Sequence, residues 1–178
     1  MRPMKLAYFD NFAFAIEGKN GAFAVNPAGK DDKLMFSIFT VKDRDIDLKG
    51  NFLSWAGEYE FGGAAVQLFA LATQELAAKV VSEDVRILFL PTLPQDITEQ
   101  QKEVIGTVDL LVIFVQDAAV WKKFIEEVDP KALIPVGPQA EKLLMEMGAA
   151  NAQTTEEFSF TAESLPTEQT VFVKLATL

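Results

Sequence analysis

The chain contains no histidine, although it is 178 residues long. Histidine is the commonest transition-metal ligand and the commonest general base near neutral pH. Its absence excludes Ser-His-Asp and Cys-His catalytic groups, and it excludes zinc held by imidazole. Cysteine is absent too, which excludes disulfides and thiolate-bound metals.

Basic residues are also scarce, with 16 Lys and Arg against 26 Asp and Glu, for a net charge of −10. This balance argues against nucleic acid and against an anionic membrane surface as partners. The longest strongly apolar run, residues 110–115, is far too short to cross a bilayer. Asp10 interrupts the apolar stretch that follows Arg2 and Lys5, so we expect no signal peptide and a cytoplasmic location.

The composition is that of a folded protein, because 49% of the residues are hydrophobic and 15 are phenylalanine. No repeat, linker or low-complexity tract divides the chain, so we expect one domain over residues 1–178. The first half is predicted as a meander of short strands, and the second half alternates strands with helices. The expected helices are 98–106, where Thr98 and Gln101 form a capping-box pattern, 117–129 and 138–148. The expected strands are 5–9, 12–17, 22–25, 33–41, 52–54, 58–61, 66–71, 78–81, 85–90, 109–115, 132–136, 158–160 and 171–175.

The stretch from Trp55 to Gly63 organises the first half. Gly57 marks a turn, residues 58–61 alternate as a strand, and Gly62-Gly63 predicts a tight turn into the next strand. Glu58 and Glu60 share one face of this strand. Paired carboxylates can carry out acid–base chemistry, but on an exposed strand face we favour solvation.

Several motifs resemble, in order, those of the metallo-β-lactamase-fold hydrolases, in particular the small bacterial L-ascorbate-6-phosphate-lactonase-like group. The resemblance implies an α/β (α+β) fold, a four-layer αββα sandwich in which two mixed sheets pack face to face with helices outside. The motifs that carry it are Gly57-Glu58-Tyr59-Glu60, Val25-Asn26-Pro27, Thr98 to Gly106 followed by Val108 to Leu111, and Asp129 to Pro135.

The same resemblance indicates that the metal site is lost. The family's His-x-His-x-Asp-His motif should follow the strand at 33–41, but residues 39–47 contain none of it. Thr92 stands at the place of the bridging aspartate and Gly137 at that of the last histidine, while Asp10-Asn11 replaces a Gly-His pair and Asn26 an aspartate. We therefore predict no catalytic residue, no metal ligand and no cofactor. The residues predicted to bind a ligand lie on the rim of a degenerate cleft: Asp10, Asn11, Asn26, Thr92 and Gly137.

Three aspartates at alternate positions resemble the start of a calcium-binding loop. Asp43, Asp45 and Asp47 have the opening spacing of an EF-hand, but the sixth position is Leu48 and the twelfth is Ser54. We favour a solvated edge strand or loop, since edge charges protect against strand addition.

Three functional hypotheses follow. The leading one is a non-catalytic homologue, a pseudoenzyme, that acts as a binding or scaffolding protein, with a protein partner or a second copy of the chain. The second is a hydrolase of phosphoesters or lactones that uses carboxylate-bound Mg²⁺ or Mn²⁺. The third is a small-molecule sensor that uses the residual cleft. The hydrolase requires at least three of the following carboxylates to converge: Asp10, Asp43, Asp45, Asp47, Glu58 and Glu60.

Overall fold

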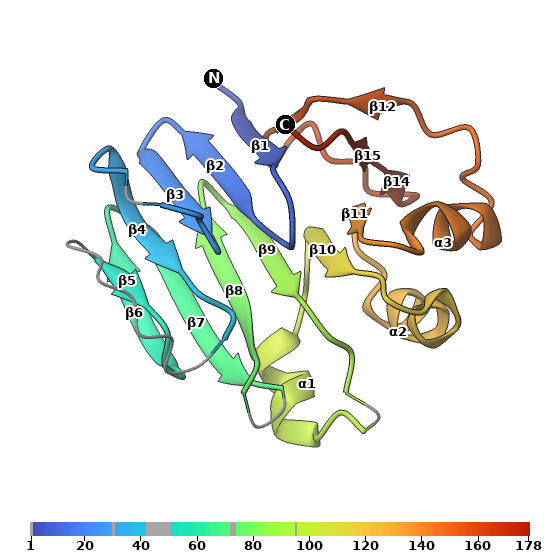
Figure 1. The fold of residues 1–178 in the computed structure, drawn as a ribbon, viewed down its shortest axis with the longest axis horizontal. Helices are drawn as coiled ribbons and strands as arrows, with labels where there is room; N and C mark the ends of the chain where they lie inside the picture. Colours follow the sequence, from blue (N-terminus) through green and yellow to red (C-terminus); the bar gives the residue numbers. More distant parts are fainter. Residues whose placement is uncertain (1, 30, 42–50, 72–73, 95) are drawn as a thin grey trace.

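The computed structural model describes residues 2–29, 31–41, 51–71, 74–94 and 96–178. Its strands form two large mixed sheets (Figure 1). The six-stranded sheet has the order β13 (Glu157–Phe160), β1 (Met4–Tyr8), β2 (Phe14–Gly18), β3 (Gly21–Val25), β4 (Leu34–Ile38), β5 (Phe52–Leu53). Its β1–β2–β3 part is antiparallel, whereas β3, β4 and β5 run parallel.

The seven-stranded sheet has a parallel half and an antiparallel half. Its order is β14 (Val171–Phe172), β11 (Ala132–Val136), β10 (Leu110–Phe114), β9 (Val85–Leu90), β8 (Leu76–Ser82), β7 (Ala64–Ala70), β6 (Gly57–Phe61). Strands β9, β10, β11 and β14 are parallel, and the meander from β6 to β9 is antiparallel. A small pair, β12 (Thr154–Thr155) with β15 (Lys174–Leu175), stands apart from both sheets.

The two sheets pack against each other through a phenylalanine-rich core. Alternate side chains of β1 to β4 point inward and are buried against the inner faces of β7 to β11. The rings of Phe14 on β2 and Phe89 on β9 join the two sheets, with their centroids 5.7 Å apart. Phe23 and Phe36 stack 4.9 Å apart on neighbouring strands. This period-two burial is what the alternating sequence of the first half predicts.

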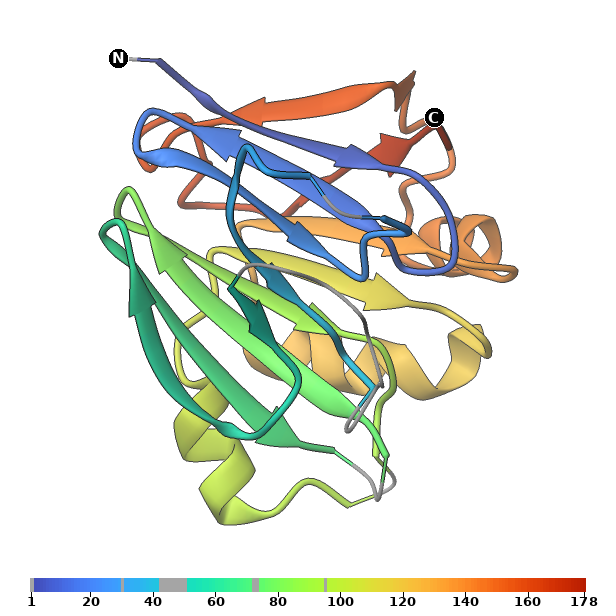
Figure 2. The ribbon, with the colours of Figure 1, turned by 60° about the vertical axis from the view of Figure 1, so that its left-hand side comes forward.

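A second core lies on the outer face of the seven-stranded sheet, beneath the helices. It includes Leu88, Leu111 and Leu133 from the sheet, together with Ile105, Trp121 and Leu143 from the helices. The helices are α1 (Glu99–Ile105), a 3₁₀ turn η1 (Ala118–Val120), α2 (Trp121–Val128) and α3 (Ala140–Glu146). Within the described residues, all of them gather on this side of the molecule (Figures 1 and 2). The prediction of two mixed sheets packed face to face with helices outside is confirmed. These helices cover the seven-stranded sheet, and among the described residues no helix covers the outer face of the six-stranded sheet.

Local signals in the sequence place most elements correctly. Thr98 and Gln101 form the expected capping box at α1, and Gly62 and Gly63 turn β6 into β7 with φ angles of 55° and 83°. Two expectations differ. The helix expected from 117 begins as the 3₁₀ turn η1, with Asp117 as its cap. The strand expected at 171–175 is split, because Phe172 pairs with β11 and Lys174 with β12.

Asp109, at the start of β10, joins three parallel strands. Its carboxylate accepts hydrogen bonds from the Arg86 backbone N–H at 2.9 Å and from the Arg86 Nε at 2.7 Å, and it pairs with the Lys131 Nζ at 2.9 Å. Its backbone N–H and C=O bond to Arg86 and Ala132. Burial alone would raise the pKa of Asp109, but the hydrogen bonds from Arg86 and Lys131 outweigh it and hold that pKa well below its usual range.

Removing this charge should destabilise the protein strongly. Asp109→Asn leaves Arg86 and Lys131 without their anion, and we expect a loss of about 2–4 kcal/mol in the free energy of unfolding, measured by urea denaturation. Glu99→Gln is the control, because Glu99 pairs with Lys102 on an exposed helix face and should cost less than about 0.5 kcal/mol. Equal effects of the two changes would contradict the assigned role.

The stabilising effect of Asp109 should disappear in acid. A carboxylate with a lowered folded pKa stabilises the protein fully above its unfolded pKa, and this stabilisation is lost as the pH falls toward the folded pKa. The difference in unfolding free energy between wild type and Asp109→Asn should thus be constant from about pH 7 to pH 5 and shrink below the ordinary Asp pKa of 3.8. Denaturation curves recorded from pH 7 to pH 2.5 measure this. A difference that stays constant throughout would disprove the assignment.

Candidate functional site

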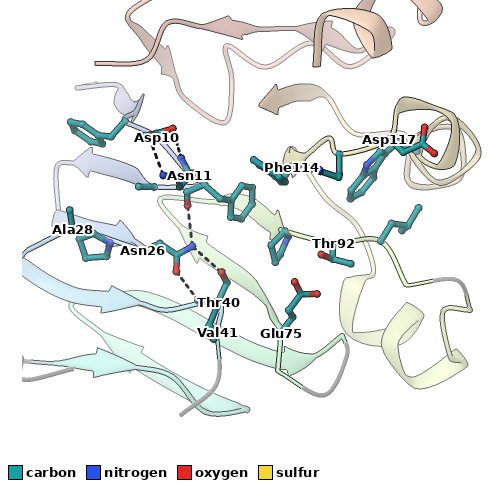
Figure 3. Close-up of a pocket in the computed structure, with 18 of the residues that line it drawn as sticks. Asp10, Asn11, Asn26, Ala28, Thr40, Val41, Glu75, Thr92, Phe114 and Asp117 are labelled. Carbon is teal, nitrogen blue, oxygen red and sulfur yellow. Dashed lines mark hydrogen bonds between the residues drawn. The ribbon is translucent and has the colours of Figure 1, made fainter. Parts of the chain in front are cut away.

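A cleft of about 810 Å³ opens where several strands end on one edge of the two sheets (Figure 3). It lies beyond the carboxyl ends of β3, β4, β9 and β10, beside the β1–β2 turn and the start of α2. In open sheets with parallel strands this edge is the usual place for ligands. The cleft is lined by Phe9, Asp10, Asn11, Phe12, Ala13, Asn26, Pro27, Ala28, Thr40, Val41, Glu75, Pro91, Thr92, Leu93, Phe114, Gln116, Asp117, Val120 and Trp121.

Asn26 fastens the floor of this cleft. Its amide NH₂ donates to the Phe12 carbonyl at 3.1 Å and to the Thr40 Oγ1 at 2.9 Å. Its amide oxygen accepts from the Thr40 backbone N–H at 2.9 Å. Asn26 has a φ of 47°, a conformation that asparagine tolerates better than most residues. The side chain thus connects three segments of the cleft, and a single acceptor lone pair is left for a ligand.

The β1–β2 turn forms one rim. Asn11 and Phe12 both have positive φ angles, 46° and 64°, and the Ala13 N–H donates to the Asp10 carbonyl at 2.7 Å. The Asp10 carboxylate accepts from the backbone N–H of Asn11 at 2.8 Å and from its side-chain amide at 3.0 Å. Burial, and secondarily the negative charge of Asp10, raise the pKa of the nearby Tyr8. Asp10 and Asn11 are exposed, so both keep polar atoms available to a ligand.

The opposite wall comes from the seven-stranded sheet and α2. Thr92 follows β9, and Asp117 follows β10 and caps η1 by accepting from the Ala119 N–H at 3.1 Å. The ring of Phe114 reaches across to Phe12, with centroids 6.2 Å apart. Trp121 packs edge-on against Phe124, 6.1 Å between centroids, and closes this wall. The wall is thus aromatic, with polar groups at its rim.

Gly137 lies in an adjoining hollow of about 420 Å³, which shares Asp10, Asn11 and Phe114 with the cleft. Its φ is 100°, and a Cβ at this position would stand 3.0 Å from the Phe114 ring and 3.2 Å from the Val115 N. Any side chain here would therefore require the ring to move. The resemblance aligns this position with the family's last histidine ligand, and a side chain there would contact the Phe114 ring.

The side chains available as metal ligands do not fit the zinc ion that the fold family implies. The chain has no histidine or cysteine, and within the described residues no three Asp or Glu side chains come close enough to hold a metal ion. Asp10, Glu75 and Asp117 lie on different sides of the cleft (Figure 3). Glu58 lines a separate hollow, beside Gln67. Asp43, Asp45 and Asp47 lie outside the described residues.

Four of the five predicted site residues, Asp10, Asn11, Asn26 and Thr92, come together in the cleft, and Gly137 lies next to it. Sequence reasoning missed further cleft residues: Thr40, Glu75, Phe114, Asp117 and Trp121. Asp117 could have been found, because it lies just after a buried strand in the half of the chain where strands alternate with helices, and ligands often bind beyond such strand ends. Glu75 carried no such signal, since its place depends on the bridge between residues 41 and 75.

The fold is that of the metallo-β-lactamase hydrolases. The structure superposes on a Thermotoga maritima protein assigned to the zinc-dependent hydrolases of that superfamily, with a TM-score of 0.75, 16% identity, and coverage of 97% of this chain and 100% of the other. The Bacillus subtilis metallo-β-lactamase-fold protein YhfI gives a TM-score of 0.62 at 10% identity, covering 99% and 97%. An isothiocyanate hydrolase from Delia radicum gut bacteria gives 0.62 at 8%, covering 89% and 100%. No family model and no curated protein sequence matches the chain.

The clamp formed by Asn26 can be tested by two substitutions. Asn26→Gly removes its three hydrogen bonds but suits a φ of 47°, and it should lower the free energy of unfolding by about 2 kcal/mol. Asn26→Ala should cost about 1 kcal/mol more, because alanine is strained at that φ. Asn51→Ala is the control, since it loses one exposed bond to the Met35 carbonyl. Thermal unfolding measures the stability of all three variants. If Asn26→Gly is as stable as the wild type, the three hydrogen bonds of Asn26 do not stabilise the cleft as proposed.

Proposed function

We propose that the protein is a non-catalytic member of the metallo-β-lactamase fold that binds a small molecule in the cleft. The observation that carries this proposal is the set of side chains in the cleft: it has a volume of about 810 Å³ and an aromatic wall, but no set of metal ligands among the described residues. A cleft of about 810 Å³ is within the range that small-molecule ligands occupy in proteins.

The distribution of exposed apolar side chains favours a ligand over a scaffold. Phe9, Val41 and Val120 are 42%, 43% and 51% exposed, and all three line this one cleft. The other large exposed apolar residues lie on five separate segments: Trp55, Val81, Met145, Val171 and Leu178. Clustered apolar exposure marks an interaction site. This favours the sensor hypothesis over a protein partner or homo-oligomer, and within the described residues no helix is long and apolar enough to span a membrane.

The hydrolase alternative receives no comparable support. It requires several carboxylates to converge on one metal ion, and Glu58 and Glu60 lie on β6, on an exposed strand face. Asp10 lies in the cleft, next to a turn. These three therefore cannot form the site that the hypothesis needs.

Blocking the cleft should abolish ligand binding. Ala28 is exposed at the rim, so Ala28→Trp should fill the mouth without unfolding the protein. In a fragment screen by NMR, compounds that shift cleft residues in the wild type should lose those shifts in Ala28→Trp. Ala65→Trp is the matched control, because Ala65 is exposed on β7 and its effect should be nil. Hits that survive in Ala28→Trp would refute the cleft as the binding site.

Metal binding tests the other half of the proposal. We expect well below one equivalent of Zn²⁺, Mn²⁺ or Mg²⁺ after incubation of the untagged protein, measured by elemental mass spectrometry, because the donors do not fit. An affinity tag would add the histidines that the chain lacks. One equivalent or more of bound metal would overturn the non-catalytic proposal, whatever the fragment screen shows.

A further inference from the structure

We propose that the ligand of the cleft is a small organic cation, an ammonium ion attached to an aromatic or bulky apolar body. This inference rests on the proposed function and names the chemical class of its ligand. It is carried by two properties of the cleft: its carboxylates have no cationic partner among the described residues, and aromatic residues line its wall. Both properties differ from what an anionic phosphoester would need.

The described residues that line the cleft carry a net negative charge. Asp10, Glu75 and Asp117 line it, and no lysine or arginine of the described residues does. Within the described residues, none of the three carboxylates forms an ion pair, although Glu17, Glu157 and Asp109 all do so elsewhere. The three surround the cleft from different sides, and Glu75 points into it (Figure 3). Like charges around a concave, low-dielectric surface focus their field, which attracts cations and repels anions.

The apolar part of the cleft suits the body of such a cation. Phe9, Phe12, Phe114 and Trp121 line it. Phe9 is exposed at the rim and Phe114 is half-buried, so these two rings are the accessible ones, whereas Phe12 and Trp121 are buried. The face of an aromatic ring attracts an ammonium group, most strongly when water is excluded. A hydrated inorganic cation would gain nothing from these rings, and a neutral apolar molecule would gain nothing from the carboxylates. An organic ammonium ion uses both.

Three probes of nearly equal size separate charge from shape: phenethylamine, 2-phenylethanol and phenylacetate. Trp55 is 52% exposed and lies outside the cleft, whereas Trp121 lines it. The Trp55→Phe variant therefore leaves Trp121 as the single tryptophan, and its fluorescence reports on the cleft. We expect phenethylamine to bind at least about tenfold more tightly than phenylacetate, with 2-phenylethanol between them. Raising the salt concentration should reduce the difference in affinity between phenethylamine and phenylacetate.

Charge-removing substitutions test the carboxylates directly. Asp10→Asn, Glu75→Gln and Asp117→Asn should each weaken phenethylamine binding by about threefold or more and leave 2-phenylethanol unchanged. Asparagine at 117 still caps η1. Glu60→Gln is the control, because it changes the net charge equally on an exposed face of β6 and should have no effect. Circular dichroism confirms that each variant is folded.

The outcomes separate this inference from the proposed function. Equal affinity for phenethylamine and 2-phenylethanol, or preference for phenylacetate, would overturn the cationic ligand but leave a binding cleft. Tighter binding of Nα-acetyl-lysine methylamide than of phenethylamine would overturn the aromatic body and indicate a lysine side chain of a protein instead. Absence of any response at Trp121 to all four probes would overturn the inference as well. The proposed function itself would be overturned only if fragments still bound to the Ala28→Trp variant, or if the protein bound a metal ion.

Discussion

The buried carboxylate of Asp109 is the interaction on which the arrangement of the parallel strands depends. It accepts from Arg86 on β9 and pairs with Lys131, just before β11, while its own backbone continues both ladders. The three strands are therefore aligned at their amino ends. Parallel strands that start at the same edge of a sheet and have similar lengths also end at the same edge. The loops after β9, β10 and β11 therefore meet at the opposite edge. Thr92, Asp117 and Gly137 occupy those loops, so the charge network at one edge determines where the cleft forms at the other.

The other half of the cleft depends on a neutral clamp instead of a charge. Asn26 joins the β1–β2 turn to the end of β4, and Thr40 extends the connection to the second sheet because its carbonyl accepts from the Leu76 N–H at 2.7 Å. This arrangement places strained backbone, at Asn11, Phe12 and Asn26, around the floor. Such conformations persist only where surrounding contacts impose them, and they often mark functional sites. The floor is thus held in one shape before any ligand arrives, which lowers the entropic cost of binding.

Features fixed by neighbours in the sequence could be predicted from it, and those fixed by distant contacts could not. The capping box at Thr98 and the Gly62-Gly63 turn involve residues three or fewer apart, and both were predicted. The split at Val173 depends on β11 and β12, which no local pattern reveals. Four predicted site residues lie in the cleft because strand ends set their place. Glu75 was missed because a bridge to residue 41 brings it there.

The cleft and its adjoining hollow meet at Phe114. At Gly137, the Phe114 ring packs where a side chain would start, so a larger residue fits there only if the ring moves. The carboxylates of Asp10, Glu75 and Asp117, which line the cleft, form no ion pair with lysine or arginine among the described residues. Like charges facing one cavity repel each other and weaken the fold, so an unneutralised set is costly to keep. A bound cation would relieve that repulsion, and its apolar body would contact the aromatic rings that line the cleft.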